Sequence, residues 1–147
     1  SCRVLRCQCQ TAWRVWEIIV IWGIHSSDIP GYAERLAPFL MNFAEKSHSR
    51  TTAVQLLDAI MAKDMQVYVA DNFKAVCLTS VHPDHIEINC CAGEDRTEWQ
   101  DELEAHIAEW ARFMGKKRVI MIARPGWQKW ARGKGYTPAH VELIRDL

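Results

Sequence analysis

The feature that most constrains the fold is an amphipathic helical pattern at residues 97–114, which lies between two stretches of strand-forming residues. Its apolar residues recur at helical spacing and form one stripe: Trp99, Leu103, Ile107, Trp110 and Met114. Thr97 and Gln100 predict a capping box at its start, and Gly115 suits its C-terminal end. A β-branched run, Arg118–Ala123, follows. Because a helix between two strands allows them to run parallel in one sheet, this pattern predicts a mixed α/β domain.

Three short strands are predicted before this helix. They span residues 67–70, 75–81 and 86–91. Turn-forming pairs separate them, Asp71 with Asn72 and then Pro83 with Asp84. Because both connections are short, neighbouring strands should pair antiparallel and form a meander.

The N-terminal half predicts one strand and two helices. Residues 13–24 are β-branched and aromatic on both faces, which is typical of a buried strand. Ser26–Asp28 can cap a first helix, in which Pro38 predicts a kink or a break. Thr52 and Gln55 predict a capping box for a second helix. We expect these two helices to be neighbours.

After residues 118–123, a short helix and a last strand are expected. Pro125 suits the first turn of a helix that carries Trp127 and Trp130. Residues 141–145 predict the final strand. The predicted fold class is therefore α/β (α+β), with a mostly antiparallel mixed sheet flanked by helices over residues 16–147 and an additional N-terminal arm over residues 1–15.

Composition excludes two classes of partner. The chain has 147 residues and zero formal net charge, with 18 Lys and Arg against 18 Asp and Glu, so no net attraction draws it to nucleic acid. No apolar run approaches the ~20 residues of a spanning helix, since Val15–Ile24 is short and contains Glu17. We expect neither nucleic acid nor a membrane as a partner.

The N-terminal arm is rich in cysteine and tryptophan. Cys2, Cys7 and Cys9 could cross-link to another subunit in an oxidising environment, and Trp13 and Trp16 are of a type enriched at protein interfaces. The arm therefore predicts an interface with other protein subunits. Free thiols are the alternative, and the absence of any CxxC pair makes zinc a weaker one.

The C-terminal third carries a resemblance to a known family. Its residues are Ala111-Arg-Phe-Met-Gly115, Arg118-Val-Ile-Met-Ile-Ala-Arg124, Pro125-Gly-Trp127 and Gly135-Tyr136. Together with the order of elements, this ending resembles the GNAT superfamily of acyl-CoA-dependent N-acyltransferases, and in particular the small GNAT-like proteins of tailed bacteriophages.

The resemblance implies where an active site would lie. In active members, the strand before the central helix offers backbone amides to the thioester, and a glycine-rich turn at the helix start binds the pyrophosphate of CoA. Residues at these positions would contact acetyl-CoA here: Cys91, Gly93, Arg96 and Thr97. Glu87 would be the general base toward an unknown amine, and Tyr136 a displaced general acid.

Two departures from the family pattern weaken that site. Residues 93–98 contain one glycine and three acidic residues around Arg96, so a phosphate would meet like charge. Ala131 occupies the position at which relatives often carry a tyrosine that protonates the thiolate. We therefore expect a degenerate acyl-CoA site without a cofactor, in a binding or structural protein. The alternative is an active N-acetyltransferase.

The sequence also leads to expectations about where the protein is located and whether it binds a metal. The resemblance implies the cytoplasm of a bacterial host, or a virion, and a viral particle or further copies of the chain as partners. His82 and His85 flank a turn and could bind a metal, but without ligands at the usual spacing they favour a polar surface. No metal is therefore predicted, and Glu87 could equally be a solvated strand residue.

Overall fold

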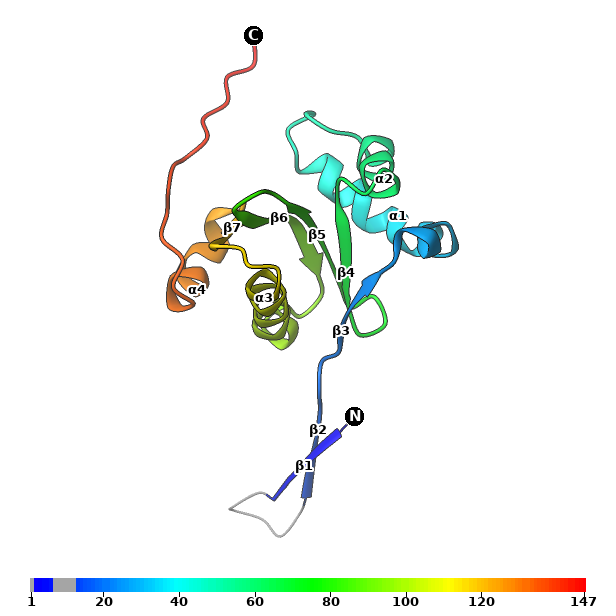
Figure 1. The fold of residues 1–147 in the computed structure, drawn as a ribbon, viewed down its shortest axis with the longest axis vertical. Helices are drawn as coiled ribbons and strands as arrows, with labels where there is room; N and C mark the ends of the chain where they lie inside the picture. Colours follow the sequence, from blue (N-terminus) through cyan, green and yellow to red (C-terminus); the bar gives the residue numbers. More distant parts are fainter. Residues whose placement is uncertain (1, 7–12) are drawn as a thin grey trace.

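A computed structural model describes residues 2–6 and 13–147, with side chains from residue 18 onward. Two sheets and four α-helices follow one another along the chain (Figure 1). The strands are β1 (Cys2–Arg6), β2 (Trp13–Glu17), β3 (Ile21–Ile24), β4 (Gln66–Ala70), β5 (Ala75–Val81), β6 (His85–Gly93) and β7 (Arg118–Met121). The helices are η1 (Ser26–Asp28), α1 (Ile29–Glu45), α2 (Ala53–Met61), α3 (Arg96–Phe113), η2 (Pro125–Trp127) and α4 (Gln128–Gly133).

The main sheet confirms the predicted class. Its strand order is β3-β4-β5-β6-β7, and β3 to β6 are antiparallel neighbours. β7 runs parallel to β6, because α3 carries the chain back between them, as the sequence predicted. A separate hairpin, β1 with β2, pairs Cys2 opposite Glu17.

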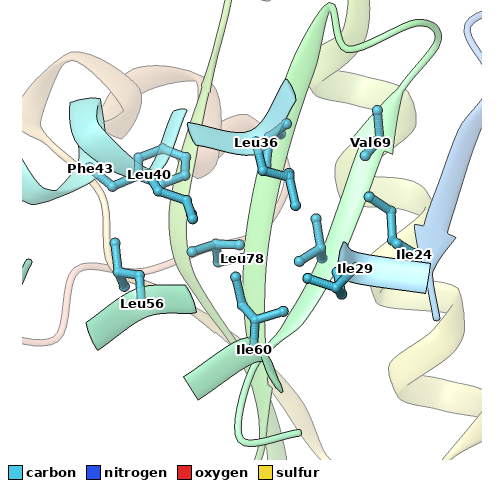
Figure 2. Packing of buried hydrophobic residues seen from close by; sticks show 11 residues of the cluster. Ile24, Ile29, Leu36, Leu40, Phe43, Leu56, Ile60, Val69 and Leu78 are labelled. Atoms are coloured by element: carbon cyan, nitrogen blue, oxygen red, sulfur yellow. The ribbon is translucent and has the colours of Figure 1, made fainter. Parts of the chain in front are cut away.

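One face of the sheet is covered by α1 and α2. Figure 2 shows Leu36 and Leu40 of α1 and Ile60 of α2 pointing toward Leu78 of β5. The buried residues of this core are Ile24, Ile29, Leu36, Leu40, Phe43, Leu56, Ile60, Val67, Val69, Val76 and Leu78. The two helices are neighbours, as expected.

The other face is covered by α3. The predicted stripe is confirmed for Trp99, Leu103 and Ile107, which are buried against the sheet, whereas Met114 follows the end of α3 and is exposed. Trp110 packs on the ring of Tyr68, whose centroid is 5.3 Å away. Burial raises the pKa of Tyr68 to about 12, with a smaller contribution from Cys77.

The single strand predicted over residues 13–24 is wrong. β2 pairs with β1 and β3 pairs with β4, so the two halves belong to different sheets. β3 begins at Ile21 because its partner β4 ends at Ala70. One residue earlier, the Val20 amide donates to the Asp71 side chain at Oδ1, 2.8 Å away, and the Val20 carbonyl accepts the Asp71 amide at 2.8 Å. A continuous apolar pattern gives no sign of such a change of partner.

Two further expectations differ from the structure. α1 continues through Pro38 without ending, and the buried Leu36, Leu40 and Phe43 on both sides of the proline offset its lost hydrogen bond. The strand predicted at residues 141–145 is wrong, because residues 136–147 form no helix or strand. This segment extends away from the body in Figure 1, and a strand needs a neighbouring edge to pair with.

The structure leaves the N-terminal interface prediction open. Cys7 and Cys9 lie outside the described residues, and only the backbone of Cys2, Trp13 and Trp16 is described. Among the described residues, no helix has the length and apolar character needed to cross a bilayer.

Candidate functional site

The candidate site begins where β6 and β7 separate. Their last pair is Ile88 with Met121, after which Ile122 donates to the carbonyl of Ile88 at 3.0 Å and the chain leaves the sheet. β6 continues to Gly93. Within the described chain, no strand pairs with that edge of β6 beyond Ile88, so its backbone groups border the opening between the strands.

A β-bulge lies at the same point. Leu78 pairs with Cys90 and Thr79 with Ile88, which leaves Asn89 as the additional residue of β6. Such bulges bend a strand and redirect its side chains. Beyond the bulge, Cys90 packs on the α1 and α2 side and Cys91 on the α3 side, the opposite orientations expected of neighbouring strand residues.

Glu87 lies one residue before this opening and has a histidine partner. Its Oε2 atom is 3.1 Å from Nε2 of His82 and 3.4 Å from Oγ of Ser80. The Asn89 side-chain amide also lies 2.9 Å from Ser80 Oγ. The Glu87 side chain is 22% exposed, so it is neither fully solvated nor sealed. A carboxylate hydrogen-bonded to an imidazole beside an open edge can accept a proton from a bound molecule.

Sequence reasoning identified Glu87 but missed its partnership with His82. The two residues face each other because Ser80 pairs with Glu87 across the β5–β6 hairpin, which brings position 82 to the same end. Only the register, set by the Pro83–Asp84 turn, shows this proximity. The expectation that His82 and His85 lack ligand partners is therefore not met.

At the other end of β6, the start of α3 differs from its prediction. The helix begins at Arg96, with Asp95 as the N-cap in a left-handed conformation, φ 51°, and no side-chain cap. The predicted box of Thr97 and Gln100 is wrong, because the earlier start moves Thr97 into the first turn. In α2 the predicted capping box is confirmed, because the backbone amide of Gln55 donates to Thr52 Oγ1 at 3.1 Å.

Gly93 is required by packing. A Cβ atom placed there would lie 2.4 Å from the carbonyl oxygen of Lys74 and 2.6 Å from Cβ of Ala75. The small residue therefore permits close contact with the start of β5. Lys74 itself forms an ion pair with Glu98, and hydrogen bonding to this carboxylate raises the pKa of the lysine.

Arg96 is held by the segment that follows β7. Its guanidinium carbon lies 4.7 Å from the centroid of the Trp127 ring, and Nη2 donates to the carbonyl of Gly126 at 3.4 Å. Trp127 in turn lies 6.0 Å from Trp99 of α3, centroid to centroid. The cation that could bind pyrophosphate is thus engaged in a cation–π contact.

α4 is fixed on α3 through one carboxylate. Trp130 Nε1 donates to Asp101 Oδ1 at 2.7 Å, and Lys134 Nζ lies 2.9 Å from the same oxygen. These hydrogen bonds hold the pKa of Asp101 below its usual value. The segment after β7 therefore rests against the first turns of α3.

The structure does not bring Tyr136 to Glu87. Tyr136 is half-buried beside Glu104 of α3, and burial followed by the Glu104 charge raises the pKa of its phenol. Glu87 instead pairs with Ser80. Ser80 lies two residues after Leu78 and therefore on the same face of the sheet, the face covered by α1 and α2. Ala131, at the position where relatives often have tyrosine, is buried.

A hollow of about 270 Å³ lies between α1 and the end of β6. Its lining residues are Pro38, Phe39, Asn42, Lys46, Ala92 and Gly93. The buried Oδ1 atom of Asn42 has no hydrogen-bond partner among the described residues. The hollow therefore combines an apolar wall with one amide and one ammonium group, and it adjoins the open end of β6.

Comparison with known proteins identifies the fold. No family model matches the sequence, and no curated protein matches it. Solved structures do match. A ribosomal-protein-alanine N-acetyltransferase from Brucella melitensis biovar Abortus 2308 has a TM-score of 0.63 at 13% identity, covering 88% of this chain and 99% of that one. The aminoglycoside acetyltransferase meta-AAC0020, from an uncultured soil metagenomic sample, has a TM-score of 0.62 at 16% identity, covering 88% and 96%.

The chain has the GNAT fold. The mixed sheet, the separation of β6 and β7, and the crossover helix α3 are its central parts. At the start of α3, Gly93 is packed against β5 and Arg96 is held on Trp127. Of the four residues proposed to contact the cofactor, Cys91 borders the opening, Arg96 is engaged and Thr97 is exposed in the first turn.

Proposed function

We propose that this chain is a GNAT-fold protein with a degenerate acyl-CoA site that serves as a binding or structural component. The observation that carries the proposal is the corner formed by residues 93–98 and Trp127. This corner presents three carboxylates, and its one arginine is stacked on a tryptophan. A protein that binds acyl-CoA needs free amides and free positive charge at this corner.

Electrostatics supports this interpretation. The N-terminus of a helix attracts anions through its unpaired amides and its dipole. Here Glu94, Asp95 and Glu98 already place negative charge there, and each such group stabilises a helix by roughly 0.3 to 1 kcal/mol. A pyrophosphate would have to approach these carboxylates, so the same groups that stabilise α3 disfavour the cofactor.

Isothermal titration with acetyl-CoA tests the proposal. We expect no binding at millimolar acetyl-CoA, whereas micromolar binding would contradict it. The double variant Asp95→Gly with Glu98→Gln should gain measurable affinity, since it removes two charges and frees Lys74 from its ion pair. The control, Glu102→Gln with Glu109→Gln, removes equal charge from exposed positions farther along α3 and should not gain affinity.

An active N-acetyltransferase acting on an unknown amine is the second candidate. The pair of His82 with Glu87, placed beside the opening between β6 and β7, favours it. In that case Glu87 would accept a proton from the amine, directly or through His82. Acetyl-CoA consumption with a panel of amines tests this candidate, and loss of turnover in Glu87→Gln would support it.

The partners we propose are other protein subunits, in a homo-oligomer or a viral particle inside a bacterial host. The resemblance of residues 111–136 to small phage proteins and the cysteine-rich arm support this proposal. Chromatography with and without reductant tests it. Covalent oligomers that disappear in the variant Cys2→Ser, Cys7→Ser, Cys9→Ser would support the arm as an interface, and a reductant-independent monomer would contradict it.

A further inference from the structure

We propose that His82, His85 and Glu87 form a binding site for a divalent transition-metal ion of the zinc type at the turn between β5 and β6. One ligand atom from each residue lies within 4.8 Å of the others. The site is distinct from the acyl-CoA corner at the far end of β6 and does not depend on the proposed function.

The distances are close to those of a metal site. The His82 Nε2 and Glu87 Oε2 atoms are 3.1 Å apart. Two ligands of a tetrahedral zinc ion, each at its usual bond length, are about 3.3 Å apart. The His82 and His85 rings are stacked, with centroids 4.4 Å apart and planes 7° from parallel, and ligand atoms of all three residues lie within 4.8 Å of one another.

The donor types indicate which metal is bound. Two imidazole nitrogens and one carboxylate oxygen suit zinc or cobalt, whereas calcium and magnesium prefer sites made of oxygen ligands. Three protein ligands also leave a fourth position for water or another ligand. This position is accessible, because the three side chains are partly exposed.

Neighbouring groups orient the ligands. Asp84 Oδ1 lies 2.6 Å from Nδ1 of His85, a contact that holds the proton on Nδ1 and leaves Nε2 free to bind a metal. A histidine that binds a metal commonly makes such a contact with a carboxylate through its other ring nitrogen.

The backbone that carries the ligands is well fixed. The His82 amide donates to the carbonyl of His85 at 2.9 Å and closes the turn. The Lys117 amide donates to the carbonyl of Asp84 at 2.8 Å, which ties the turn to the start of β7. Lys116 and Arg118 add positive charge nearby, and the carboxylates of Asp84 and Glu87 balance it. The ligands are thus presented by a paired hairpin rather than a free loop.

Cobalt titration tests the site. The protein used is the full chain with Cys2→Ser, Cys7→Ser and Cys9→Ser, so that the N-terminal thiols cannot compete for Co²⁺. We expect one Co²⁺ per chain, with the visible absorption of a four-coordinate ion and without a sulfur-to-cobalt charge-transfer band. No uptake of Co²⁺, or a charge-transfer band that shows thiolate ligands, would overturn the proposal.

Variants assign the ligands. In that background His82→Gln, His85→Gln and Glu87→Gln should each weaken Co²⁺ binding about tenfold or more, and Asp84→Asn, a positioning residue, by about 10- to 100-fold. His140→Gln, an exposed histidine of the C-terminal segment, is the matched control and should bind as its parent does. Circular dichroism confirms folding of each variant. Unchanged affinity in both His82→Gln and His85→Gln would overturn the assignment.

Discussion

The two ends of β6 differ in how their polar side chains are used. At the His85 end, His82, His85 and Glu87 converge and remain partly exposed. At the Gly93 end, Arg96 stacks on Trp127 and Glu98 pairs with Lys74, while Glu94 and Asp95 are exposed. The titratable side chains near one end therefore contact one another, whereas Arg96 and Lys74 near the other end are each engaged by a neighbouring side chain.

An acyltransferase of this fold has two requirements, an open strand edge with a base beside it and a binding site for its cofactor. The two ends of β6 correspond to these two requirements. The opening between β6 and β7 and the base beside it depend on strand register and on the bulge at Asn89. Cofactor binding depends on the side chains and backbone of residues 93–98. Among the described residues, no side-chain hydrogen bond joins the two regions, so one region can change without the other. The predictions below test how independent the two ends are.

The largest effect is expected at Trp99. Its side chain is 1% exposed, and Nε1 donates to the carbonyl of Glu94 at 2.7 Å. Trp99→Ala should lower the free energy of unfolding by about 3 to 5 kcal/mol, because it leaves a cavity under the Gly93 end. His82→Ala at the other end should cost less than about 1 kcal/mol. Chemical denaturation measures both values, and equal losses would contradict the contrast.

A second comparison is between Gly93, which is closely packed, and Gly126, which has free space around it. Gly93→Ala places a methyl group 2.4 Å from the Lys74 carbonyl oxygen and should cost about 1 to 3 kcal/mol. At Gly126 an added Cβ would meet nothing within 4 Å, so Gly126→Ala should change stability by less than about 0.5 kcal/mol. Thermal unfolding of both variants checks this difference, and a tolerated Gly93→Ala would show that β6 is not tightly packed on β5.

Substitutions at the starts of α2 and α3 should have a smaller effect on stability. Thr52→Ala removes a capping box and should cost about 1 kcal/mol. Thr97→Ala removes no cap, because Asp95 occupies that position, and should cost less than about 0.5 kcal/mol. Urea denaturation distinguishes the two variants. An equal loss of stability in Thr97→Ala and Thr52→Ala would support the capping box that the sequence predicted at Thr97.

Substitution of Asp95 should give the smallest change in stability, and an increase where the variants above give a loss. Its φ of 51° is unfavourable for a residue with a side chain, and its carboxylate makes no capping hydrogen bond. Asp95→Gly should relieve about 1 kcal/mol of this conformational cost and lose about 0.5 kcal/mol of charge stabilisation at the helix start, so the free energy of unfolding should rise by about 0.5 kcal/mol. Replacement with alanine at the same position is the control and should not stabilise the protein.

The sequence predicts the parts of the fold that depend on local periodicity. The α3 stripe around Trp99 is readable because this helix keeps one buried face, and the meander from β4 to β6 is readable because turn-forming residues separate its β-branched runs. The break before Ile21 is not readable, since it depends on where β4 ends. The strand predicted at residues 141–145 fails for a similar reason, because apolar residues form a strand only beside a paired edge.

The candidate site was predictable in part. Glu87 and the acidic turn could be named from the family pattern, but the contact of Glu87 with His82 requires the hairpin register. The stacking of Arg96 on Trp127 joins segments about thirty residues apart, and no spacing rule predicts it. Proximity that depends on tertiary packing has no signal in a single sequence.

The most direct test of the degenerate site is a ¹⁵N-labelled chain titrated with acetyl-CoA and followed by amide resonances. Our account predicts that the amides of Asn89 to Glu98 keep their chemical shifts at millimolar acetyl-CoA, because no pyrophosphate binds at the start of α3. Ligand-dependent shifts at Arg96 and Thr97, together with shifts along the free edge of β6, would contradict it and establish a functional acyl-CoA site.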